Sequence, residues 1–162
     1  MAIKKKWRRE LTPGEKRVNF KYLEEQWTSA EATLVDDLVP VLIQVIDRLE
    51  TDLRKILDSE NYKDLGNLKA GYKDKLVGVF KVHMFDAFKV GKRGVYSEFK
   101  VQKDATLNAR AREYMSAKAE ATVNDILDKM KSHAIFIALK GIKAGLTTDQ
   151  IIAEMKGPAF KE

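Results

Sequence analysis

The stretch Ala138-Leu-Lys-Gly-Ile-Lys-Ala-Gly-Leu-Thr-Thr-Asp-Gln-Ile-Ile-Ala-Glu-Met155 decides the fold of this chain. It describes a helix, a glycine stop and a newly started helix. Gly145 suits the left-handed conformation just past a helix C-terminus. Thr147 and Gln150 fit a capping box, which satisfies the free amides at a helix start. The sequence therefore predicts a helical corner here, which is local structure and not catalytic chemistry.

Apolar residues upstream of this corner predict two long helices. Apolar residues at intervals of four and three predict a helix from about Ser29 to Leu57. They form a stripe of Leu34, Leu38, Leu42, Val45, Leu49, Leu53 and Ile56. Pro40 lies inside it and predicts a kink or a division near Val39. A second helix is predicted over residues 67–99, with a break at Gly91–Gly94, because its large apolar residues fall four apart.

The remaining segments complete an all-α prediction. Asp104 can cap a third helix, which we expect to be interrupted at residues 123–125 before it resumes toward Gly145. A short last helix follows from about Thr148 to Lys156. Residues 28–100 thus form a long antiparallel helical hairpin and residues 104–157 a shorter helical C-terminal unit. Together they make a helical domain over residues 28–162, preceded by an extended basic and aromatic arm over residues 1–27.

The arm carries the clearest candidate contact residues. Cations neutralise phosphates and an indole can stack, so we expect sequence-independent DNA contact from the cluster Lys4, Lys5, Lys6, Arg8 and Arg9 around Trp7. The alternative is a solubilising tail. An exposed basic bend adds Lys92 and Arg93 to the candidate DNA contacts. The candidate protein-interface anchors are aromatic, namely Trp7, Phe20, Tyr22 and Trp27.

Composition sets limits on these interpretations. The chain has 162 residues, a formal net charge of +6 and no cysteine. Disulfides, thiol catalysis and cysteine-based zinc sites are therefore excluded. Residues 31–60 are acidic, whereas residues 1–30 and 61–103 are basic, which indicates either a polyanionic partner or helices of opposite charge packed together. No apolar run reaches the roughly 20 residues of a membrane span. We expect a protein located inside a cell or a virion, with no membrane partner.

No catalytic, cofactor-binding or metal-binding residue is predicted. His83 and His133 each lie in a predicted helix without the further ligands, at helical spacing, that a metal site needs. Adjacent carboxylates such as Asp36 and Asp37 point about 100° apart on a helix and do not face each other. The basic run at Gly91–Gly94 lacks the glycine spacing and the following Ser or Thr of a phosphate-binding loop.

Two segments carry a family resemblance. Arg8-Arg-Glu-Leu-Thr-Pro-Gly-Glu-Lys-Arg-Val-Asn-Phe20, the long helix after it and the corner at Gly141–Ile152 together resemble the N-terminal helical region of tailed-bacteriophage minor head proteins, also called head-morphogenesis proteins. That region ends in a turn into a short helix. The positions that match the motif of this turn are Gly141, Ile142, Gly145, Thr147 and Ile151.

The resemblance implies a non-enzymatic virion component that associates with the portal or the capsid interior and touches DNA during packaging or ejection. Its location would be the virion or the host cytoplasm, and homo-oligomer formation is a further expectation. Members of that family are usually longer and carry another C-terminal domain, whose contribution is not implied here. The rival interpretation is a helical protein that binds DNA without sequence preference.

Overall fold

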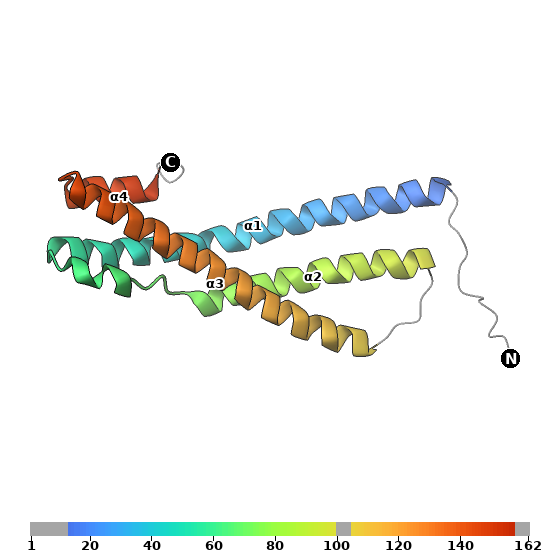
Figure 1. Ribbon diagram of the computed structural model, residues 1–162. Helices are drawn as coiled ribbons and strands as arrows, with labels where there is room; N and C mark the ends of the chain where they lie inside the picture. The colour runs from blue at the N-terminus through green and yellow to red at the C-terminus, as the bar shows by residue number, and fades with distance from the viewer. Residues whose placement is uncertain (1–12, 100–104, 158–162) are drawn as a thin grey trace. The chain divides into compact units, whose positions relative to one another are not determined.

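The computed structural model describes residues 13–99 and 105–157, and within these ranges the chain is helical without strands. The described residues form the α-helices α1 (Pro13–Asp58), α2 (Lys73–Phe99), α3 (Ala105–Lys143) and α4 (Thr148–Lys156), which are labelled in Figure 1. A short 3-10 helix, η1 (Tyr62–Asn67), precedes α2. The all-α prediction is confirmed. In the described part of the chain, no helix combines the length and the apolar character that crossing a membrane requires.

Helix α1 is longer than predicted at its N-terminus. It begins at Pro13 and not at Ser29, so residues 13–27 are helical and not an extended arm. The reason is that proline is well tolerated in the first helical turn, where its missing N–H would have no partner. Residues 1–12 lie outside the described residues. Helix α1 also continues through Pro40, so the division predicted near Val39 is absent.

The connection before α2 corrects the predicted start of that helix. Instead of beginning at residue 67, α2 begins at Lys73, after η1 and a short extended link. The link ends with positive φ angles at Gly71 and Tyr72, of 68° and 53°, which turn the chain into α2. Once started, α2 runs to Phe99 without the predicted break at Gly91–Gly94.

Helix α3 is likewise continuous. The predicted interruption at residues 123–125 is wrong, because Val123 is fully buried and holds that turn in the core. Small residues line the inner face of α3, where Ala119, Ala134 and Ala138 are fully buried. Tyr114, by contrast, exposes 68% of its surface.

Two compact units can be distinguished along the chain. The first comprises residues 1–37 and 78–119, and the second comprises residues 38–77 and 120–162. Helices α1, α2 and α3 each contribute to both units, whereas η1 and α4 belong to the second. The side-chain pairs Asp37–His83 and Gln44–Lys75 show that α1 and α2 run antiparallel, as the predicted hairpin requires.

The second unit contains most of the buried apolar side chains. Helix α1 supplies Val45, Leu49 and Leu53, which confirms the central part of the predicted stripe. It also buries Leu57, whereas Ile56 of the predicted stripe is half-buried. The segment around η1 and the start of α2 add Leu65, Leu68 and Leu76. Helix α4 closes this core with three buried residues, Ile151, Ile152 and Met155. The chain thus folds its short last helix onto the second half of α1 and α3.

The corner between α3 and α4 has the structure that the sequence predicts. Gly145 has a φ of 67°, and its amide N–H donates to the carbonyl oxygen of Ile142. The Thr147 hydroxyl accepts from the Gln150 amide, while the Gln150 side chain accepts from the Thr147 amide. The capping box is therefore complete.

Gly141 is required for a different reason: a side chain at this position would collide with Ile151. A Cβ atom on Gly141 would lie 2.4 Å from Cγ1 of Ile151 and 2.9 Å from its Cδ1. Ile151 is 2% exposed and β-branched, so it has little freedom to move away. The absence of a side chain at Gly141 lets α4 approach the end of α3 closely.

We expect Gly141→Ala to lower the free energy of unfolding by about 1–3 kcal/mol, because the added methyl group overfills the contact with Ile151. Gly78→Ala is the matched control: Gly78 is also helical, but a Cβ there meets no atom within 4 Å. The control should be neutral or stabilise by up to about 1 kcal/mol. Urea unfolding followed by circular dichroism measures both, and equal effects would contradict the close approach.

Candidate binding groove

A groove of about 270 Å³ lies in the first unit between α2 and α3. Helix α2 contributes Lys81, Val82 and Phe85, and helix α3 contributes Arg112, Met115 and Ser116. The apolar wall comes from Val82, Phe85 and Met115. Val82 exposes 58% of its surface, whereas Met115 exposes only 8%. The groove therefore combines an accessible apolar side with a buried floor.

Cations surround the aromatic ring of this groove. The Arg112 guanidinium lies 4.6 Å from the centroid of the Phe85 ring, and the Lys89 ammonium lies 4.7 Å from it. Phe85 also stacks on Phe88, with ring centroids 6.2 Å apart. Lys89 in addition pairs with Asp86. Such cation–π contacts hold the ring and keep positive charge next to an apolar surface.

None of the predicted contact residues is among the described residues that line the groove. Lys92 lies on α2 one turn beyond Phe88, with its ammonium 6.0 Å from the Phe88 ring centroid. Arg93 and Phe20 lie in helices, but their side chains are outside the described part of the structure, as are Lys4, Lys5, Lys6, Trp7, Arg8 and Arg9. The predicted bend at Lys92 and Arg93 is instead continuous helix.

Two predicted interface anchors are placed on α1. Tyr22 and Trp27 expose 47% and 43% of their surface. They are five residues apart, so they project to different sides of the helix. Sequence reasoning missed Phe85 and Arg112. The interval of four between Lys81, Phe85 and Lys89 was the available signal for α2, but the position of Arg112 depends on the pairing of α2 with α3.

His83 is the one histidine that the structure buries among the described residues, at 9% exposure. Its Nε2 atom lies 2.8 Å from Oδ2 of Asp37, so α1 and α2 share a polar contact within the first unit. No group of three or more potential metal-ligating side chains gathers anywhere in residues 13–99 or 105–157. The arrangement around His83 is therefore a two-residue contact between helices.

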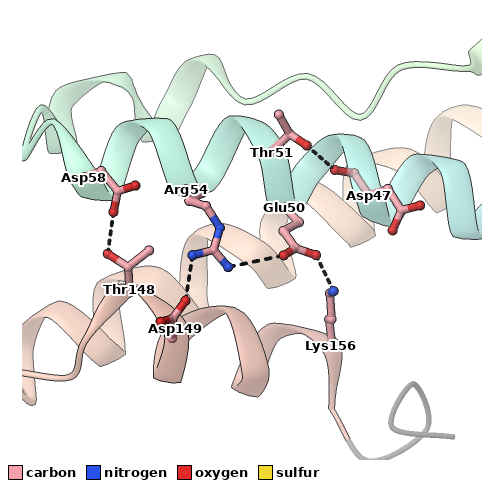
Figure 2. A network of polar contacts seen from close by, with 8 residues as sticks. All are labelled: Asp47, Glu50, Thr51, Arg54, Asp58, Thr148, Asp149 and Lys156. Atoms are coloured by element: carbon pink, nitrogen blue, oxygen red, sulfur yellow. Dashed lines mark hydrogen bonds and ion pairs between the residues drawn. The ribbon is translucent and has the colours of Figure 1, made fainter.

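The second unit holds a different polar cluster, shown in Figure 2, which joins α1 to α4. Arg54 donates to Oδ1 of Asp149 at 2.6 Å and lies 3.4 Å from Oε1 of Glu50. Lys156 pairs with the other oxygen of Glu50. One turn further along α1, Asp58 accepts a hydrogen bond from the Thr148 hydroxyl at 2.9 Å. The polar contacts thus join both ends of α4 to α1.

These contacts shift two pKa values. The hydrogen bond from Lys156, helped by Arg54, lowers the pKa of Glu50 from its ordinary value of 4.5, although partial burial opposes this. The hydrogen bond to Asp149, followed by the one to Glu50, raises the pKa of the exposed Arg54 guanidinium. Both shifts favour the charged forms. The cluster has the character of a structural clasp, and no reacting group is held in it.

Comparisons with known proteins add no assignment: no family model, no curated protein and no solved structure matches this chain.

We expect Asp37→Ala to lower the free energy of unfolding by about 1 kcal/mol, because the buried ring nitrogen of His83 loses its partner. Asp36→Ala is the matched control, since Asp36 is the adjacent exposed carboxylate on the same helix. A surface substitution of this kind should change stability by less than about 0.5 kcal/mol. The melting temperatures of both variants, measured by thermal unfolding, test this prediction. Equal melting temperatures would contradict a role for the Asp37–His83 contact.

We expect the Glu50 clasp to make stability depend on pH. The pKa of Glu50 is lower in the folded state than in the unfolded state. Its contribution to the free energy of unfolding is therefore complete above the unfolded-state pKa, near 4.5, and is lost as the pH falls through the folded-state pKa. Glu50→Gln should therefore be less stable than the wild type at neutral pH, and the difference should shrink in acid. Urea unfolding at several pH values measures this.

The exposed pair Lys129–Asp125 supplies the control for that series. Asp125→Asn should change stability by no more than about 0.5 kcal/mol at neutral pH. A difference between Glu50→Gln and the wild type that stays constant down to strong acid would show that Glu50 acts through packing alone.

Proposed function

We propose that this chain is a non-enzymatic component of a tailed-bacteriophage virion, a helical module that docks on the portal or the capsid interior. The observation that carries the proposal is the corner between α3 and α4. Four of the five matched positions of the motif have a physical role in this corner. Gly141 gives space for Ile151, Gly145 adopts a left-handed conformation, and Thr147 caps α4.

The stop at Gly145, the cap at Thr147 and the contact between Gly141 and Ile151 are three separate physical requirements. A helix stop needs one glycine, but it does not need a second glycine four residues earlier or an isoleucine that packs on it. Ile151 is buried against Gly141, so these two positions constrain each other. A corner with this combination supports kinship with proteins that end a helical region in the same way.

The proposal includes sequence-independent DNA contact by the basic cluster Lys4, Lys5, Lys6, Arg8 and Arg9, with Lys92 and Arg93 as further contacts. The distribution of charge supports it. The first unit contains 17 basic and 11 acidic side chains, whereas the second contains 13 of each. The whole net charge of +6 therefore belongs to the unit that holds these residues. Surplus positive charge in one unit favours contact with a polyanion.

Capture of tagged protein from a lysate that expresses the surrounding phage-like gene cluster tests the docking role. After nuclease treatment, we expect portal or capsid subunits to remain bound. A second tagged chain that lacks residues 1–12 keeps α1 complete from Pro13 and should retain the same protein partner. Loss of every protein partner on nuclease treatment would contradict docking.

The charge distribution also favours a second candidate, a helical protein whose main role is to bind DNA without sequence preference. The two candidates differ in affinity and salt dependence. For a duplex of arbitrary sequence, the logarithm of the binding constant falls with log salt by about 0.9 per neutralised phosphate. Tight binding with a steep slope, together with no protein partner, would replace the docking proposal. Weak binding to duplex DNA that is lost when residues 1–12 are removed would support the docking proposal.

A further inference from the structure

We propose that the groove of the first unit binds Trp27 from a second copy of this chain. The occupant would be a stripe on α1 made of Glu24, Trp27, Glu31 and Val35. Both surfaces belong to the first unit, so one copy carries the groove and its complement. This inference does not rest on the proposed function, because it concerns only how the chain recognises itself.

The dimensions of the groove suit a single large side chain. At about 270 Å³ it falls below the roughly 300–1,000 Å³ of pockets that enclose small molecules. Buried aromatic anchors in protein interfaces occupy pockets that hold one side chain and exclude water. Val82 and Phe85 provide an apolar wall, and buried Met115 provides an adaptable floor. An indole matches this lining better than a charged or a small group does.

The stripe on α1 has the complementary pattern. Its residues are spaced by three, four and four, so they lie along one face of the helix. Trp27 exposes 43% of its surface and Val35 exposes 55%, while both glutamates are exposed. The indole is thus flanked on each side by a carboxylate within about one turn of helix. Tryptophan is enriched at protein interfaces, because its ring is apolar while its N–H can reach a hydrogen-bond partner.

Charge makes the match specific. Arg112 and Lys81 line the groove, and Glu24 and Glu31 flank the indole that would enter it. Opposite charges at the rim steer association and fix the orientation of the two surfaces. The Arg112 guanidinium, already stacked on Phe85, can also accept an indole face through a cation–π contact. If each copy donates Trp27 to the other, the contact is reciprocal and closes as a two-fold dimer.

Sedimentation velocity of the full chain over a dilution series tests the inference. We expect a reversible dimer whose dissociation constant rises with salt, since rim charges are screened. Trp27→Ala should raise the dissociation constant more than tenfold. Tyr62→Ala is the matched control, because Tyr62 exposes 41% of its surface, lies in the second unit and belongs to neither proposed surface, so the dimer should be unchanged. Circular dichroism of each variant verifies that it remains helical.

A charge exchange provides a test that loss of folding cannot imitate. Glu24→Arg with Glu31→Arg should weaken the dimer more than tenfold, and so should Lys81→Glu with Arg112→Glu. All four substitutions in one chain should restore a dissociation constant within about tenfold of the wild type, because the opposite charges face each other again.

Three results would overturn the inference. The first is a chain that stays monomeric at every concentration. The second is a dimer that Trp27→Ala and the charge reversals leave intact. The third is a monomer in which Lys81→Glu with Arg112→Glu abolishes binding to duplex DNA, because the groove would then serve nucleic acid and not a second copy.

Discussion

Contact between the backbone at Gly141 and the side chain of Ile151 is the constraint on which the second unit depends. It sets how closely α4 approaches the end of α3. That position brings Ile151, Ile152 and Met155 into the core formed by α1 and α3. A side chain at position 141 would move α4 outward, and its three apolar residues would lose part of their burial together.

The polar clasp between α1 and α4 depends on the same placement. Arg54 can reach Asp149, and Lys156 can reach Glu50, only when α4 lies along α1. The pairs are partly exposed, so they add orientation more than net stability. Apolar burial supplies the main attraction and turns the face with Ile151, Ile152 and Met155 toward the core. The clasp adds directional contacts that join both ends of α4 to α1.

Local signals in the sequence were sufficient for the corner and insufficient for the longer helices. The stop at Gly145 and the cap at Thr147 depend on neighbouring residues, and the structure contains both. The start of α1 was misjudged because residues 1–27 were assigned to an extended arm, although Pro13 fits a first helical turn. The breaks predicted in α1 and α3 failed for a related reason. Packing of residues such as Val123 outweighs weak local preferences.

The sequence alone could not predict the candidate groove. The interval of four between Lys81 and Phe85 indicates the α2 side. The α3 side has no such signal, because helical periodicity does not tell which face of α3 contacts α2. Tyr114 illustrates the difficulty: it is an apolar residue that is largely exposed, while its neighbour Met115 is buried. A difference of one residue rotates a side chain by about 100° and changes its neighbours completely.

The uneven division of charge has a consequence for how the protein meets its surroundings. A molecule with evenly spread charge approaches a polyanion in any orientation. Here the net positive charge lies in the first unit, since the second has equal numbers of basic and acidic side chains. The long-range field of a polyanion would therefore exert its net attraction on the first unit before any contact forms.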